Sequence, residues 1–129
     1  MGNDKTVLIA EPAELLSSEL RTFLDEMGFN SILVTTLKET MLTLQQQRVD
    51  VLVLDAALLE EDCQFISVIK GIVEDLNIII CAETNTPEFE SKVRKQRIFF
   101  YHIRSFGTQD LTMAISNAVS YTHLTLPTN

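Results

Sequence analysis

The chain is poor in the residues from which nucleotide sites, metal clusters and disulfide frameworks are built. Its 129 residues include no tryptophan, and its four glycines stand apart at Gly2, Gly28, Gly71 and Gly107. They form no phosphate-cradling loop, and the sequence shows no Ser/His or Cys/His pattern of a nucleophilic enzyme. The two cysteines, Cys63 and Cys81, lack metal-binding spacing, so we expect buried free thiols in a reducing cytoplasm. These absences disfavour an enzyme or a nucleotide-binding domain.

Basic residues and long apolar runs are also scarce. Ten lysines and arginines face 18 acidic residues, for a net charge of −8. Residues 1–62 carry 12 acids and 4 bases, whereas residues 63–129 carry 6 of each. The acidic first half argues against general binding to nucleic acids or membrane surfaces. No apolar run approaches the roughly 20 residues that cross a bilayer, and the N-terminus has no signal-peptide pattern. We therefore expect a cytoplasmic protein without membrane contact.

What the sequence does contain is five short apolar runs that alternate with amphipathic segments. The runs cover residues 6–10, 31–35, 49–54, 77–81 and 98–103. Short apolar runs with polar flanks are typical of strands buried on both faces of a parallel sheet. The alternation predicts a flavodoxin-like α/β fold, a (βα)5 three-layer sandwich whose five-stranded parallel sheet has the order 2-1-3-4-5.

Capping residues locate the predicted helices and the ends of the domain. Pro12 is expected to open the first helix and Gly28 to end it, Asp62 to cap the third helix, and Thr86 to cap a fourth that runs to about Gln96. We expect one domain over residues 5–121. Residues 122–129 have no charge and no helical stripe, so they are expected to be a linker stub, a disordered end or a non-native extension.

Two carboxylates end neighbouring strands of the predicted sheet. Asp55 closes the third apolar run and Glu11 follows the first, and the carboxyl ends of strands one and three meet at the switch point where such folds bind ligands. Paired carboxylates repel unless a cation lies between them, and Mg²⁺ prefers oxygen ligands. Because an aspartate can accept a phosphoryl group, the pair favours a small magnesium site for phosphoryl chemistry. Acidic residues at strand ends can equally cap helices and face solvent, and the residues alone leave both readings open.

From about Lys5 to Tyr121 the chain resembles the receiver domain of bacterial two-component response regulators. The resemblance rests on the strand order, on the apolar strand that ends in Asp55, on Tyr101 in the fifth strand, and on Arg104-Ser105-Phe106 where the family usually has Lys-Pro-Phe. It implies that Asp55 is the phosphoacceptor. It also implies a magnesium site formed by Glu11, Asp55 and the carbonyl of Ala57.

Among the departures from the family's pattern, three concern the expected metal and switch positions. The second acidic residue, usually a direct metal ligand, is Pro12; the hydroxyl residue after the fourth strand is Ala82; and the lysine is Arg104. Proline has no side-chain oxygen, alanine donates no hydrogen bond, and a guanidinium is bulkier and planar. The resemblance therefore implies weak Mg²⁺ binding and weak coupling from Asp55 through the switch positions Ala82, Tyr101 and Arg104.

Two functions remain open at this point. The first is a receiver-like signalling module in a phosphorelay, with a sensor histidine kinase or another signalling protein as partner. The second is a pseudo-receiver that never uses phosphate and serves as a protein-interaction or dimerisation scaffold. In both, the face made by the fourth helix, the fifth strand and the fifth helix is the expected contact, including a homodimer contact, and neither is an enzyme.

Basic residues near the fourth helix raise the alternative of nucleic-acid contact. Glu88 and Glu90 stand four residues before Lys92 and Arg94, the favourable order for ion pairs along a helix. This pattern favours a solvated face or a protein partner. We assign four residues to the predicted interaction face, with His102 expected at the edge strand or interface: Lys95, Arg97, Tyr101 and His102.

Overall fold

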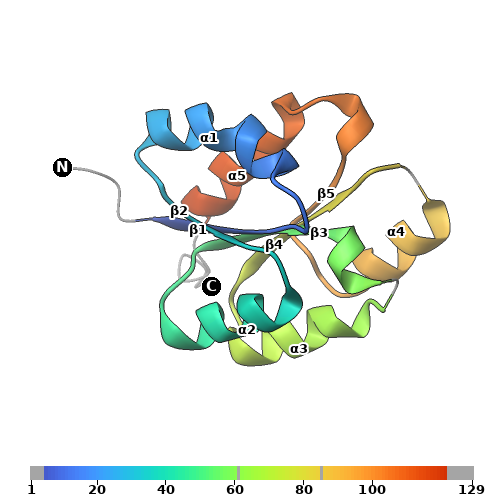
Figure 1. Cartoon of the computed structure of the whole chain (residues 1–129). Coiled ribbons are helices and arrows are strands. Elements are labelled where there is room, and N and C mark those ends of the chain that lie inside the picture. Colours follow the sequence, from blue (N-terminus) through green and yellow to red (C-terminus); the bar gives the residue numbers. More distant parts are fainter. Residues whose placement is uncertain (1–4, 61, 85, 122–129) are drawn as a thin grey trace, which may run out of the picture.

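A five-stranded parallel sheet organises the computed structural model, which describes residues 5–60, 62–84 and 86–121. The strand order is β2-β1-β3-β4-β5, and every neighbouring pair is parallel. This confirms the predicted flavodoxin-like fold class and its order (Figure 1). The strands are β1 Thr6–Ala10, β2 Asn30–Val34, β3 Val51–Asp55, β4 Asn77–Ala82 and β5 Phe100–Ile103.

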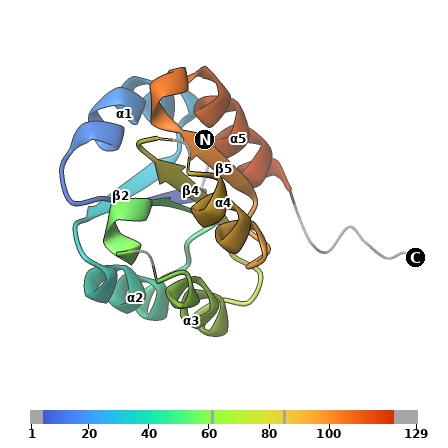
Figure 2. The same ribbon diagram turned by 90° about the vertical axis from the view of Figure 1, so that its right-hand side faces the viewer.

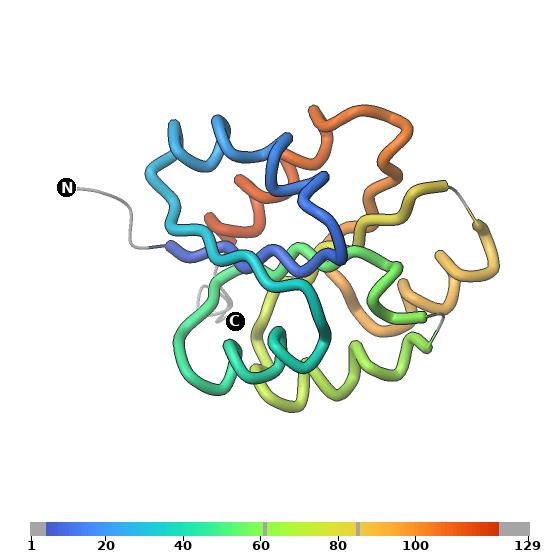
Figure 3. Tube along the Cα trace, viewed as in Figure 1, coloured from blue at the N-terminus to red at the C-terminus, as the bar shows by residue number. Residues whose placement is uncertain are grey.

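Helices cover both faces of the sheet. Helices α1 and α5 lie on one face, and α2 and α3 lie on the other, with α4 beside β5 (Figures 1 and 2). The trace in Figure 3 shows each strand leading into the helix that follows it. The helices are α1 Leu15–Met27, α2 Leu37–Gln46, α3 Gln64–Ile72, α4 Pro87–Arg94 and α5 Gln109–Ser120, with short 3-10 turns at Ala56–Leu59 and Arg104–Phe106.

Alternation along the strands divides the core into two layers. In β3, Leu52 and Leu54 face the α2, α3 and α4 side, whereas Val51 and Val53 face α1 and α5. All residues of β3 and β4 are buried, as expected for central strands of a doubly covered parallel sheet. Burying each such side chain contributes about 1.5–3 kcal/mol. The central strands therefore hold their carboxyl ends, where Asp55 lies, in a fixed place.

The ends of several elements differ from the sequence-based expectation. Helix α1 begins at Leu15 instead of Pro12, and β5 begins at Phe100 instead of residue 98. Helix α4 ends at Arg94, and Arg97 then adopts a left-handed backbone with φ of 63° that turns the chain into β5. Propensity alone does not mark these ends, because they depend on contacts with other elements.

Most other expectations are confirmed. Gly28 ends α1 in the left-handed conformation, with φ of 73°. The N-cap of α3 is Cys63 instead of the predicted Asp62, which lies one residue earlier and accepts a hydrogen bond from the Gln64 N–H. Cys63 and Cys81 are free and buried. Within the described ranges, no helix has the length and apolar character needed to span a membrane. The predicted tail, residues 122–129, lies outside the described residues.

A matched pair of leucines tests the two-layer core. Leu20 on α1 is fully buried, whereas Leu42 on α2 is 43% exposed. We expect Leu20→Ala to lower the free energy of unfolding by about 2–5 kcal/mol, because it removes buried surface and leaves a cavity. Leu42→Ala is expected to cost less than about 1 kcal/mol. Urea unfolding of both variants measures the difference, and equal losses would contradict the placement of α1.

Candidate functional site

A cleft of about 690 Å³ opens at the carboxyl ends of the strands. Asp55 lines it from β3, Ala82 from β4, and Arg104 from the turn after β5, while Pro12 and Ala57 contribute from the loops. The structure thus gathers residues that are up to 92 positions apart in the sequence, Pro12 and Arg104, at the edge where α/β folds bind ligands. The sequence-based location of the site at this edge agrees with the cleft.

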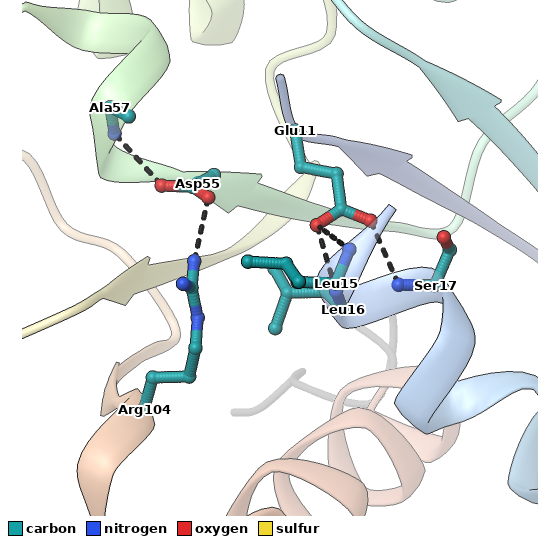
Figure 4. Close-up of polar contacts among 7 residues, drawn as sticks. All are labelled: Glu11, Leu15, Leu16, Ser17, Asp55, Ala57 and Arg104. Atoms are coloured by element: carbon teal, nitrogen blue, oxygen red, sulfur yellow. Dashed lines mark hydrogen bonds and ion pairs between the residues drawn. The ribbon is translucent and has the colours of Figure 1, made fainter. Parts of the chain in front are cut away.

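Both carboxylate oxygens of Asp55 are bound within the protein. Oδ2 lies 2.7 Å from an Arg104 terminal nitrogen, and Oδ1 accepts a hydrogen bond of 2.9 Å from the Ala57 N–H (Figure 4). Asp55 is 6% exposed. A buried carboxylate is costly unless it is paired and hydrogen-bonded, and these two contacts meet that need. A cation or phosphoryl donor that reaches Asp55 must therefore compete with the guanidinium.

Glu11 lies at the end of the neighbouring strand but points away from Asp55. Its Oε1 accepts from the N–H groups of Leu15 and Leu16 at 3.1 and 2.8 Å, and its Oε2 accepts from Ser17 at 2.8 Å. Figure 4 shows this carboxylate turned toward the first turn of α1. The side chain satisfies amides that have no intrahelical partner and matches the helix dipole. Of the two readings left open by the sequence, helix capping is the one that the structure shows for Glu11.

The predicted magnesium ligands do not converge in this structure. Glu11 is 1% exposed, and both its oxygens are committed to backbone amides. Pro12 lines the cleft where an acidic ligand would be needed. In the described part of the chain, no three His, Cys, Asp or Glu side chains are placed to hold a metal ion. Of the three predicted ligands, this leaves Asp55 and the Ala57 carbonyl. Two protein oxygens are a poor match for the six-coordinate geometry of Mg²⁺.

Tyr101, one of the predicted switch residues, is held inward under α4. It is 5% exposed; its ring centroid lies 6.5 Å from that of Phe89, and the Arg94 guanidinium lies 5.7 Å from the ring. Burial raises the pKa of the Tyr101 phenol. Arg94 is itself fixed by an ion pair of 2.7 Å with Glu90, as the sequence predicted. Helix α4 therefore contacts β5 through an aromatic ring pair, Phe89 with Tyr101, and through a cation–π contact from Arg94.

The loop after α4 is tied to α3. The Ser67 hydroxyl donates to the Gln96 side chain at 2.5 Å, and Lys70 donates to the Arg97 carbonyl at 2.9 Å. Lys95 and Arg97 of the predicted interaction face remain exposed. These contacts limit how far α4 can move relative to α3.

The assignment of His102 to the interaction face is wrong, because the residue is fully buried. Along β5, Tyr101 and Ile103 pack on the side of α3 and α4, so His102 points to the opposite side, beneath α5. There its Nδ1 lies 3.1 Å from Oδ1 of Asp110. Tyr101 is also too buried to present its ring to a partner.

Sequence reasoning also missed a polar row across the sheet. Asp55 pairs in register with Cys81, and Cys81 pairs with His102. The strand order 3-4-5 together with the position of each residue in its strand could have revealed it. Burial raises the pKa of the Cys81 thiol, and Cys81 is 0% exposed. The neighbouring thiol and imidazole are therefore not an accessible nucleophilic site.

Comparison with known proteins gives matches among solved structures only. No family model and no curated protein matches the chain. A response regulator from Thermotoga maritima has 18% identity and a TM-score of 0.82, covering 92% of this chain and 100% of its own. The beryllofluoride-activated NtrC4 receiver domain dimer has 23% identity and a TM-score of 0.79, covering 89% of this chain and 96% of its own. A signal receiver domain of a two-component histidine kinase from Clostridium thermocellum has 18% identity and a TM-score of 0.79, covering 92% and 100%.

These neighbours define the class of the fold. Five parallel strands in the order 2-1-3-4-5 with alternating helices, matched over most of the chain, make this the fold of response-regulator receiver domains.

A test of the capping role replaces Glu11 by glutamine. The amide nitrogen of glutamine cannot accept the hydrogen bonds that Glu11 receives from α1, so we expect Glu11→Gln to lower the free energy of unfolding by about 1.5–3 kcal/mol. Glu19→Gln, at an exposed position of α1, is the control and is expected to change it by less than about 0.5 kcal/mol. Denaturant unfolding at neutral pH measures both, and a neutral Glu11→Gln would rule out the cap as a stabilising contact.

Proposed function

We propose that this chain is a receiver-like signalling module of a phosphorelay system, in which Asp55 has the phosphoacceptor position but phosphorylation is weak. The observation that carries the proposal is the Arg104–Asp55 ion pair of 2.7 Å within a strand-end cleft of a receiver fold. The position of Asp55 at a strand end in this cleft supports phosphoryl transfer to it. Its carboxylate is already neutralised by a cation of the protein.

Three features of the cleft support weak phosphorylation. Pro12 offers no metal ligand, and Glu11 is committed to α1. Ala82 lines the cleft without a hydroxyl group that could bind a phosphoryl oxygen. Without a divalent cation, a phosphoryl group on Asp55 would add negative charge to a cleft in which, among the described lining residues, Arg104 and Lys92 supply the positive charge. Weak Mg²⁺ binding by Asp55 and the Ala57 carbonyl is the most that this cleft supports.

The output of the module is a protein contact. Tyr101 is already packed beneath α4, and the loop after α4 is tied to α3, which supports a single preset arrangement of α4 against β5. The exposed Lys95 and Arg97 border the surface of α4, β5 and α5. The partner is a sensor histidine kinase or another signalling protein, or a second copy of the chain through the same surface, in the cytoplasm and without nucleic acid, membrane contact or enzyme activity.

The second candidate is a pseudo-receiver scaffold that never uses phosphate. The specific observation that favours it is that both oxygens of Asp55 have partners within the protein. The two candidates differ in whether Asp55 responds at all to a phosphoryl analogue.

Beryllofluoride with millimolar Mg²⁺ distinguishes them. We expect the wild-type protein to show small backbone amide shifts near Asp55 and Ala57 that do not extend to Tyr101, lost in Asp55→Asn. The variant Pro12→Asp/Ala82→Thr/Arg104→Lys supplies the missing carboxylate, hydroxyl and compact cation, and is expected to bind at least about tenfold more tightly, a gain of about 1.4 kcal/mol.

A control variant and three possible results separate the two candidate functions. Adding Asp55→Asn to the triple variant must abolish the response, because the analogue mimics phosphorylated aspartate. If beryllofluoride shifts amide resonances in the triple variant but not in the wild-type protein, the scaffold is favoured. A wild type that binds as tightly as the triple variant, with shifts extending to Tyr101, would contradict the weakened site.

A further inference from the structure

The end of β5 touches both the Asp55 cleft and helix α5. Arg104 binds Asp55 at 2.7 Å. Two residues earlier, His102 places Nδ1 3.1 Å from Oδ1 of Asp110, the second residue of α5. The rest of the α5 face that packs on the sheet is apolar, with Leu111 and Ile115 fully buried. The His102–Asp110 contact is therefore a polar link between β5 and the first turn of α5.

Cys81 links Asp55 to His102 in the sheet and has several charged groups near it. In register order across the sheet, Asp55 lies beside Cys81 and Cys81 beside His102. The charges of Glu11, Asp55, Arg104 and Asp110 all act on the Cys81 thiol. The row lies in a buried setting in which charges are screened less than at the surface. A change of charge at Asp55 therefore acts on Cys81, the residue that lies between Asp55 and His102 in the sheet.

Buried polar atoms without hydrogen-bond partners are concentrated at the end of β5 and the start of α5. Among the described residues, four of the six buried side-chain polar atoms without a hydrogen-bond partner belong to His102 and the two charged residues beside this link: Nδ1 and Nε2 of His102, Nε of Arg104 and Oδ1 of Asp110. Buried polar atoms without partners are rare in folded proteins, and each calls for an explanation. Here His102 and Asp110 are close enough for an ion pair, but their alignment does not complete a hydrogen bond. Such a contact can rearrange at lower cost than a fully satisfied one.

We propose that helix α5 senses the state of Asp55 through Arg104 and His102. When the charge of Asp55 is removed or engaged, Arg104 loses its partner, the end of β5 shifts, and the contact between His102 and Asp110 changes with it. This link runs on the α5 side of β5, whereas Tyr101 packs on the opposite side with Phe89. It deepens the proposed function by giving Asp55 an output on α5 that needs neither a hydroxyl at position 82 nor movement of Tyr101.

Nuclear magnetic resonance of the full chain tests the link without any phosphodonor. The chain has two histidines, so His123→Gln assigns the ring nitrogen signals of His102. We expect Asp55→Asn to shift the His102 ring nitrogens by at least about 1 ppm and to shift the amide resonances of residues 109–112. We expect Arg104→Gln to move the same signals. In an Asp110→Asn background, Asp55→Asn should still move the His102 ring while the effect on the α5 amides is lost.

The matched control is Glu19→Gln, which also removes one carboxylate but lies at an exposed position of α1; it should leave these signals unchanged. If Asp55→Asn moves the Ala57 amide yet leaves the His102 ring and the α5 amides in place, the proposal is overturned. Because beryllofluoride is absent, this result is independent of whether Asp55 is ever phosphorylated.

A thermodynamic cycle provides the second measurement, in case Asp55→Asn perturbs signals throughout the protein. Asp55→Asn and Asp110→Asn are nearly isosteric changes on different elements, so independent sites would multiply their effects on the unfolding equilibrium constant to within about twofold. We expect the double variant to deviate from that product by more than about twofold. Agreement with the product would overturn the link.

Discussion

The need to neutralise a buried carboxylate at the end of a fully covered strand shapes the functional edge of this protein. Asp55 ends β3, all of whose residues are buried, and is itself 6% exposed. Water is largely excluded from such a position, so the protein must supply the partners of the charge. Arg104 and the Ala57 amide do so, and the turns after β3 and β5 are fixed relative to one another by these contacts.

The neighbouring Glu11 meets the same constraint in another way. Its carboxylate takes three amides at the start of α1, which begins at Leu15 for that reason. The two acidic residues are therefore not a pair that shares a cation. One is paired with an arginine across the cleft and the other is bound to a helix terminus, and this separation is what supports the proposal of weak Mg²⁺ binding.

The same logic extends to the two sides of β5. Tyr101 is covered by Phe89 and Arg94 on the α4 side, while His102 is buried against Asp110 on the α5 side. The strand thus carries one contact that is well packed and one that is incompletely hydrogen-bonded.

The sequence by itself determined the fold class, the strand order and the place of Asp55, because the period and length of apolar runs depend on local residue patterns. It also indicated the Glu90–Arg94 pair and the Gly28 helix end, which are contacts between near neighbours in the chain. Only the tertiary structure decided that Glu11 caps α1 instead of facing Asp55, and that His102 is buried beneath α5 instead of lying at an interface. Side-chain direction at the end of a strand depends on which helix terminus or charge lies nearby, and partners such as Arg104 for Asp55 are 49 residues away in the sequence. A local sequence pattern does not predict such a contact, because the two residues meet only when the sheet and its helices pack together.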